Sequence, residues 1–189
     1  MAITEVMSNT DRQYDEAIKA CKDIFIRKTQ DYGTSWRVLR TISIVDQLFI
    51  KAQRIRTIQQ KGVSRVGEDI KGEFIGIVNY GIIGLIQLEL KEIAIEDVPA
   101  GKVANWYDEQ VKLVQNVMED KNHDYGEAWR EMSQESFVDL ILMKLMRIRQ
   151  ILSNDGKTLI SEGIDSNYTD IINYAVFGLI LISEGKHKG

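Results

Sequence analysis

The sequence predicts an all-α protein in which a three-helix unit occurs twice in tandem, packed as a helical bundle with a pseudo-two-fold axis. One observation is a repeated motif: KTQDYGTSWR begins at Lys28, and KNHDYGEAWR begins at Lys121, 93 residues later. Another is the helical spacing of apolar residues, with no segment that alternates convincingly as a strand. Because self-similarity at a fixed period indicates duplication, we expect residues 1–97 and 98–189 to be two repeats of one compact, fused domain.

The match between the two copies extends well beyond the motif. With the same spacing Tyr14 corresponds to Tyr107, and after one extra residue near Gly156 the spacing becomes 94, so that Asn79 corresponds to Asn173. Further identical pairs are Ser43/Ser136, Asp46/Asp139, Lys51/Lys144, Arg54/Arg147, Arg56/Arg149, Glu68/Glu162, Tyr80/Tyr174 and Gly84/Gly178. A duplicated core alone does not explain why so many charged residues match.

Each unit is predicted to contain three helices. We expect them at residues 14–30, 43–60 and 68–91 in the first unit and at 106–123, 136–153 and 162–184 in the second. The glycine of the Asp-Tyr-Gly motif ends the first helix of each unit, because glycine accepts the left-handed backbone that follows a helix. Ser43 and Ser136 stand just before apolar runs and are the expected N-caps of the second helices. Pro99 lies in EDVPAGK, the segment that joins the units.

The third helix of each unit contains the most apolar segment of the chain. These segments, residues 74–88 and 168–182, are 15 residues long and each holds an asparagine. A bilayer span needs ~20 apolar residues. We therefore expect buried core helices and no membrane partner.

Composition excludes several classes of protein. The net charge is −4, whereas proteins that neutralise many nucleic-acid phosphates are usually basic, so we expect no bulk nucleic-acid partner. The single cysteine, Cys21, cannot form an internal disulfide, and its apolar helical surroundings favour packing over catalysis. The first residues, MAITEVMSNTDRQYDE, show no basic region followed by an apolar stretch, which predicts no signal peptide and a cytoplasmic location.

Charges interrupt the second helix of the second unit, FVDLILMKLMRIRQI at residues 137–151. At about 100° per residue, Asp139, Lys144 and Arg147 fall on one arc, while Arg149 points away. The corresponding arc of the first unit consists of Asp46, Lys51 and Arg54. Because unpaired buried charges are costly, the arc is either a structural salt-bridge network or a pocket lining that holds phosphates and a metal or water. Two cations for one anion favour an anionic ligand.

Carboxylates and amides gather on the third helices. Asp170 and Asn173, three residues apart, share a face, and Glu162 and Asp165 form a similar pair. Oxygen ligands of this kind suit Mg²⁺, which binds one or two carboxylates together with substrate phosphates. The expected metal ligands are Glu162, Asp165 and Asp170, with Glu68 in the first unit. For the two matching asparagines, a buried amide that bonds between helices is the alternative to a site role.

The first unit differs at one of these positions. Gly76 stands where the second unit has Asp170, and Asp69 and Glu73 are its nearby acids. We therefore place a single competent metal site around Glu162 and Asp170, and interpret the first unit as a weaker or degenerate copy.

The repeated motif has two interpretations. Its aromatic residues could pack beneath the end of the helix, or a nucleobase could stack on a ring with phosphates held by nearby cations. The candidate binding residues are Lys28, Asp31, Tyr32, Trp36 and Arg37 in the first unit and Lys121, Asp124, Tyr125, Trp129 and Arg130 in the second.

The sequence shows no nucleophilic triad, no glycine-rich phosphate loop and no cysteine–histidine metal cluster. His123 is replaced by Gln30 in the first unit, and His187 lies in the C-terminal tail. Any chemistry is therefore expected to depend on carboxylates, a metal ion and water.

Three segments, KNHDYGEAWR, DLILMKLMRIRQI and SEGIDSNYTDIINYAVFGL, resemble the nucleotide-modification-associated domain 1 family. This is a bacterial and phage group of uncharacterised function, and it includes tandem two-unit members. The resemblance extends from Tyr14 to Glu184. It implies a link with nucleotides, because the genomic association of the family is with nucleotide modification, and it assigns no reaction.

A more distant similarity is to MazG-like all-α NTP pyrophosphatases. Those enzymes hold Mg²⁺ with carboxylates on two helices and cut nucleoside triphosphates to monophosphate and pyrophosphate. Their usual signature pairs Glu-x-x-Glu with a later Glu-x-x-Asp. Here Asp170-x-x-Asn173 replaces the second element, and Glu89-x-x-Glu92 has no counterpart in the second unit.

The leading hypothesis is nucleotide binding, with Mg²⁺-dependent hydrolysis of a nucleoside triphosphate as its sharper form. The candidate catalytic residues are Glu162, Asp170 and Asp139. Phosphates would be held by Lys121, Arg130, Lys144 and Arg147, with Asn173, Lys51 and Arg54 as further binding residues, and the base by Tyr125 or Trp129. The alternatives are a non-catalytic nucleotide sensor or partner-binding module, and a structural helical oligomer. Fusion of the units makes an internal dimer, and a homodimer of the whole chain is a further expectation.

Overall fold

The computed structural model describes residues 8–62, 69–159 and 161–189, which form six α-helices and two short 3₁₀ helices and contain no strand. The first unit consists of α1 (Asn9–Tyr32), η1 (Ser35–Val38), α2 (Thr41–Lys61) and α3 (Ile70–Leu90). The second unit consists of α4 (Ala100–Tyr125), η2 (Ala128–Glu131), α5 (Gln134–Ser153) and α6 (Ile164–Ser183). The all-α prediction is confirmed. The 3₁₀ helix after each Asp-Tyr-Gly motif was not predicted.

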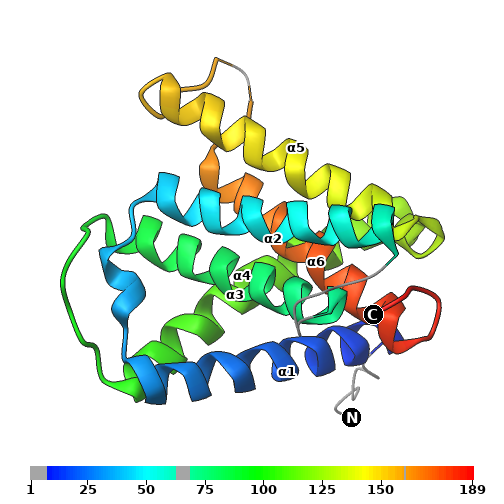
Figure 1. Cartoon of the computed structure of the whole chain (residues 1–189), viewed down its shortest axis with the longest axis horizontal. Helices are drawn as coiled ribbons and strands as arrows, with labels where there is room; N and C mark the ends of the chain where they lie inside the picture. Colours follow the sequence, from blue (N-terminus) through cyan, green and yellow to red (C-terminus); the bar gives the residue numbers. More distant parts are fainter. Residues whose placement is uncertain (1–7, 63–68, 160) are drawn as a thin grey trace, which may run out of the picture.

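The two units share one core, with α3 and α6 packed against each other at its centre (Figure 1). Helix α2 covers α3, α5 covers α6, and α2 and α5 also pack on each other. Helices α1 and α4 each contact both central helices. This arrangement is the pseudo-two-fold bundle that the duplication predicts.

The contact between α3 and α6 is reciprocal. A Cβ atom on Gly84 of α3 would lie 2.7 Å from the ring of Tyr168, and a Cβ atom on Gly178 of α6 would lie 3.0 Å from the ring of Phe74. The two glycines correspond in the duplication, as do the two rings. Each ring thus fills the space that a missing side chain leaves on the opposite helix, as a two-fold relation requires.

The helix ends follow local chemistry, but α1 and α4 begin five and six residues before the expected starts at 14 and 106, and two N-caps were predicted wrongly. Gly33 and Gly126 adopt positive φ angles of 63° and 61° just after α1 and α4, as expected. The predicted caps Ser43 and Ser136 are wrong, because both lie inside the first turn of their helices. Ser133 caps α5 by accepting a 3.1 Å hydrogen bond from the Ser136 amide. A capping hydroxyl reaches an amide two or three residues ahead, so the cap precedes the position that was chosen.

Among the described helices, only α3 has the length and composition of a membrane span. Of its most apolar segment, 72% is buried inside the protein. Its apolar side chains are accounted for by the contacts with α2 and α6. Helix α3 is therefore a core helix of this fold.

Candidate functional site

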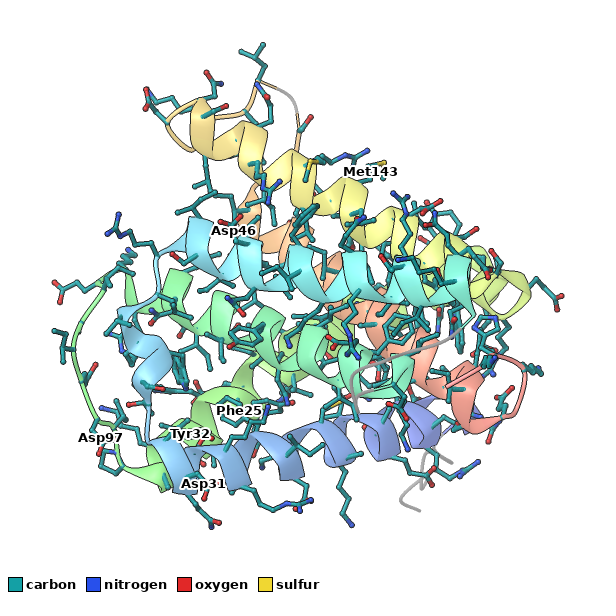
Figure 2. All side chains as sticks on the ribbon, in the orientation of Figure 1. Phe25, Asp31, Tyr32, Asp46, Asp97 and Met143 are labelled. Atoms are coloured by element: carbon teal, nitrogen blue, oxygen red, sulfur yellow. The ribbon has the colours of Figure 1, made fainter. Side chains whose placement is uncertain are left out.

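A pocket of about 440 Å³ lies in the first unit between the C-terminal part of α1, η1, α2 and α3. Figure 2 shows Phe25 on the inner side of α1, Tyr32 at the end of that helix and Asp31 pointing outward. The lining is largely apolar and aromatic and includes Phe25, Tyr32, Trp36 and Tyr80. Small-molecule sites in proteins are roughly 300–1,000 Å³ and mostly apolar with a few polar groups, which matches this pocket.

Two lysines are the charged groups of this lining, and no carboxylate is among the described residues that form it. Lys28 on α1 is exposed and forms no ion pair within the described part of the chain. The Lys51 ammonium forms an ion pair with Oε2 of the buried Glu73 at 3.7 Å, a distance too long for a hydrogen bond. It also lies 5.6 Å from the centre of the Tyr80 ring. The pocket therefore has an excess of positive charge.

Gly76 gives Lys51 its path to the pocket. A Cβ atom at this position would lie 2.9 Å from Cδ and 3.2 Å from Nζ of Lys51, so the lysine stem passes directly over the glycine. Any side chain at position 76 would have to displace that stem. The absence of a side chain on this turn of α3 thus places the ammonium group beside the cavity.

Trp36 contributes an unusual polar group to the same pocket. Its indole Nε1–H is buried and has no hydrogen-bond partner among the described residues. In the second unit the corresponding Trp129 donates from Nε1 to Oδ1 of Asn122 at 3.1 Å. An unmet buried donor is costly, and the Nε1–H of Trp36 is such a group among the described residues.

The motif turn is held in place by the linker between the units. The hydroxyl of Thr34 donates to the carbonyl of Glu96 at 2.7 Å and accepts from the amide of Val98 at 2.9 Å. Figure 2 shows Asp97 of this linker beside the end of α1 that carries Tyr32. The linker thereby fixes η1, and with it Trp36, against α1.

Asp170 occupies the equivalent place in the second unit. Its Oδ1 accepts a 2.7 Å hydrogen bond from Nζ of Lys121, and its Oδ2 accepts one of 2.8 Å from Nζ of Lys144. These lysines correspond to Lys28 and Lys51. Burial lowers the pKa of Lys121, but the hydrogen bond and charge of Asp170 outweigh it, so this pKa is raised above its ordinary value. The second unit neutralises its own lysine pair.

The predicted metal site is not assembled in the structure. Both oxygens of Asp170 are bonded to ammonium groups, while Glu162 and Asp165 are exposed. Within residues 8–62, 69–159 and 161–189, no three His, Cys, Asp or Glu side chains are grouped so as to hold a metal ion. Glu68, the expected ligand of the first unit, lies outside the described residues. The involvement of Mg²⁺ stays a prediction, without a ligand set from these residues.

The charged residues that were predicted to form one polar arc on α2 and one on α5 pair with different partners. Asp139 pairs with Arg56 at 2.6 Å, and Asp46 pairs with Arg149 at 2.9 Å, so both carboxylates bridge α2 and α5. Asp139 therefore does not join Asp170 in one site, as the arc implied. Arg149, which was expected to point away from the arc of its own unit, pairs with Asp46 of the other unit.

The arginines of the two arcs also have different environments. Arg54 pairs with Glu73, whose side chain is almost fully buried. Asn167 stands at the position of Glu73 in the second unit, and Arg147 instead lines an open cavity of about 710 Å³ with Lys144, Lys157 and Glu162. The structure thus brings Lys144, Arg147 and Glu162, all predicted site residues, to one cavity.

The motif arginines have structural partners. Arg37 is buried and donates from Nε to Glu96 at 2.8 Å and from Nη1 to Gln87. Arg130 donates to Gln13 and Glu184, both at 2.8 Å. The prediction that Arg37 and Arg130 bind phosphate is not supported, because their donors already tie the motif to the linker, α1 and α6.

Some aromatic residues of the motif are packed in the protein, and others line the pocket where a nucleobase could stack. Trp129 is stacked on Phe177 with centroids 4.2 Å apart and planes 5° apart, and the Arg130 guanidinium lies 4.4 Å from its ring centre. Trp129 is therefore packed and has no free face of the kind a base needs. Trp36 and Tyr32 line the open pocket of the first unit. Tyr125 is exposed, as Tyr32 is, so it is not packed beneath the helix end, and its role in base binding stays a prediction.

Asn79 and Asn173 are buried amides that form hydrogen bonds between helices, which was the alternative to a role in the site. Asn173 donates to the carbonyl of Val114 at 3.2 Å, and its Oδ1 accepts from the Tyr14 hydroxyl at 2.6 Å. With these bonds Asn173 joins α6 to α4 and α1 and is not positioned as a substrate ligand. Of the remaining candidates, Asp124 is exposed and contacts His123 at 3.1 Å, and Asp31 is exposed on the outer side of α1.

Sequence reasoning missed the apolar half of the pocket. Ile24, Phe25, Ile75 and Ile83 line it, and a helical pattern does not distinguish such residues from core residues. One available signal was the exchange of Asp170 for Gly76, which removes a carboxylate from a position whose two lysine neighbours are kept. The sequence placed the main site in the second unit, where Lys144, Arg147 and Glu162 do line an open cavity, whereas the pocket with aromatic walls and the lysines Lys28 and Lys51 lies in the first.

The family described as nucleotide modification associated domain 1 matches the chain twice, over residues 28–88 and 121–182. The two matches fall on equivalent parts of the two structural units, from the end of the first helix through most of the third. No curated protein and no solved structure matches the chain, and these comparisons give no support to a similarity with MazG-like pyrophosphatases. The chain therefore belongs to the nucleotide modification associated domain 1 family, in a form that contains the domain twice.

Proposed function

We propose that the first unit binds a nucleotide, with its phosphates at Lys28 and Lys51 and its base against the aromatic wall of the pocket. The observation that carries this proposal is the exchange at one position. Where Asp170 neutralises two lysines in the second unit, Gly76 leaves their counterparts facing an open pocket. The family description, which refers to nucleotide modification, supports the same class of ligand.

Phosphate oxygens would supply the acceptors that the Lys51 ammonium lacks. Hydrogen bonds to charged groups contribute about 1.5–3 kcal/mol each when water is largely excluded. Lys51 is suited to such a bond because only 23% of its side chain is exposed. Lys28 is exposed, so its contribution is smaller and more sensitive to salt.

The apolar part of the pocket suits a planar ring. Tyr32 and Trp36 offer faces for a base, and base–aromatic stacking contributes about 1–3 kcal/mol per base. The unpartnered Nε1–H of Trp36 is buried and would donate to a ring nitrogen or carbonyl oxygen once a shift of the indole exposes it. An inorganic anion would leave both the rings and this donor unused, which is why we favour a nucleotide over a simple phosphate.

Hydrolysis to monophosphate and pyrophosphate with Mg²⁺ is the sharper form of the proposal and stays a prediction. A metal ion brought by the triphosphate itself would not depend on the carboxylates Glu162, Asp165 and Asp170. A cytoplasmic location, the absence of bulk nucleic acid as a partner, and a homodimer of the whole chain are likewise predictions.

Calorimetric titration with standard and modified ribo- and deoxynucleoside mono- and triphosphates, with and without Mg²⁺, tests the proposal. We expect one site per chain for at least one nucleotide, weaker binding of inorganic phosphate, and weaker binding at high salt. Ion-exchange separation of the same mixtures tests turnover. Absence of binding by every nucleotide would contradict the proposed function, and binding without product would reject only its hydrolytic form.

A further inference from the structure

We infer that the second unit contains a copy of the same binding site, which Asp170 and Phe177 keep closed from within. This inference rests on the proposed function of the first unit. It assigns Asp170 the role of a built-in anionic occupant, whose carboxylate marks where the anionic group of a ligand lies between Lys28 and Lys51.

The anionic end of the closed site is defined by three side chains. Lys121 and Lys144 approach the two oxygens of Asp170 at 2.7 and 2.8 Å, so the carboxylate bridges them. Asp170 is 8% exposed and Lys144 is 12% exposed, which excludes most solvent from their contact, whereas Lys121 is 51% exposed. A carboxylate and a phosphate offer the same pair of acceptor oxygens, so a phosphate is the natural ligand for the equivalent lysine pair of the first unit.

The ring end of the closed site is filled by a second substitution. Phe177 stacks on Trp129 at 4.2 Å, and its counterpart in the first unit is Ile83, which lines the open pocket near Trp36. The Phe177 ring thus lies where a planar ring would lie against Trp36. One side chain stands in for the anion and the other for the base.

The hydrogen bonding of the two indole nitrogens also differs between the closed and the open site. In the closed unit Nε1 of Trp129 has an internal acceptor, Oδ1 of Asn122, whereas the first unit has Thr29 at that position and its hydroxyl bonds to the carbonyl of Phe25. Nε1 of Trp36 consequently has no partner among the residues the structure describes. The two units therefore differ at three places, where the second has Asp170, Phe177 and Asn122. In each case a side chain of the second unit makes the contact that a ligand would make in the first.

The test opens one site and closes the other in the full-length chain. Asp170→Gly with Phe177→Ile gives the second unit the residues of the first at the two closing positions, and Phe177→Ile alone is the matched control that keeps the carboxylate. Gly76→Asp supplies the missing carboxylate to the first unit, and Gly76→Ala controls for crowding against the Lys51 stem. Each protein is titrated calorimetrically with the standard and modified ribo- and deoxynucleoside mono- and triphosphates that test the proposed function, after circular dichroism has established that it is folded.

We expect the number of sites per chain to rise from one to two in the opened variant and to stay at one in Phe177→Ile. It should fall to zero in Gly76→Asp, whereas Gly76→Ala should keep one site with weaker affinity, because its methyl group shifts the Lys51 stem but adds no carboxylate. Should glycine weaken α6 too far, Asp170→Ala with Phe177→Ile serves the same purpose, because alanine favours the helix.

The outcomes separate the inference from the proposed function. One site in both the wild type and the folded, opened variant would overturn the inference and leave the proposed function intact. Binding by the opened variant alone would uphold the closed site and contradict the function proposed for the first unit. Absence of binding by either protein would overturn both.

Discussion

The hydroxyl of Tyr107, in the second unit, donates a 2.7 Å hydrogen bond to Oδ1 of Asn79 in the first. The same bond runs in the opposite direction between Tyr14 and Asn173, at 2.6 Å. Burial raises the pKa of both tyrosines well above its ordinary value, so both remain donors at neutral pH. The two units are therefore joined by a pair of equivalent buried hydrogen bonds, which holds α3 and its pocket in a fixed relation to α4.

Removal of either tyrosine hydroxyl should destabilise the fold. Tyr107→Phe leaves the buried Oδ1 of Asn79 without its donor, at a cost of about 1–3 kcal/mol in the free energy of unfolding. Tyr14→Phe should cost a similar amount because its environment is equivalent. Urea unfolding measures both, with Tyr32→Phe as control, since that hydroxyl belongs to a residue that is 72% exposed. A loss in one variant without a comparable loss in the other would contradict the two-fold relation.

The two motif tryptophans should differ in their response to the same substitution. Trp129→Phe removes a hydrogen bond to Asn122, whereas Trp36→Phe removes an indole N–H that has no partner among the described residues. We therefore expect Trp129→Phe to cost about 1 kcal/mol more than Trp36→Phe in unfolding free energy. Chemical denaturation of the two variants measures the difference. An equal or larger cost for Trp36→Phe would show that its Nε1–H is satisfied in the protein.

Glu184 should stabilise the protein in a pH-dependent way. Hydrogen bonds from Gln13 and Lys186, and one from Arg130, lower the pKa of its carboxyl below the ordinary value, although burial opposes them. A lowered folded pKa means that the stabilisation is present above the unfolded pKa and is lost as the pH falls through the folded pKa. The stability difference between wild type and Glu184→Gln should therefore shrink from about pH 6 to about pH 3.

Thermal unfolding at several pH values follows this difference directly. Glu131→Gln, at an exposed position on η2, is the control and should change stability by less than about 0.5 kcal/mol near neutral pH. A gap between wild type and Glu184→Gln that widens toward acid pH would contradict the assigned partners.

The fold could be predicted from the sequence because its determinants are local and occur twice. The apolar segments around Asn79 and Asn173 predicted core helices, and the matching glycines after Tyr32 and Tyr125 predicted the ends of α1 and α4. The N-caps and the 3₁₀ helices were missed because they depend on short-range geometry that several nearby polar residues satisfy equally well. Ser133 and Ser136 illustrate this, since only the path of the chain decides which serine is the cap.

The candidate site was only partly predictable. Lys28, Lys51 and Trp36 were recognised from their repetition, but repetition also selected Arg37 and Arg130, whose donors are used for structure. Identical residues in the two units do not show which charged side chains have a partner inside the protein. The presence of a partner depends on single residues of the neighbouring helix that differ between the units. Gly76 and Asp170 form such a difference, and only the packing of α2 on α3 and of α5 on α6 reveals its consequence.

The most direct test of the central claim compares the same substitution at two equivalent positions. The affinity for the four 2′-deoxynucleoside triphosphates is measured by calorimetry for wild type, Lys51→Met and Lys144→Met. Lys51→Met should weaken binding at least about tenfold, which corresponds to a loss of about 1.4 kcal/mol. Lys144→Met should leave the affinity within about twofold, because its charge is already neutralised by Asp170. Loss of binding in Lys144→Met with unchanged binding in Lys51→Met would place the site in the second unit and contradict the account.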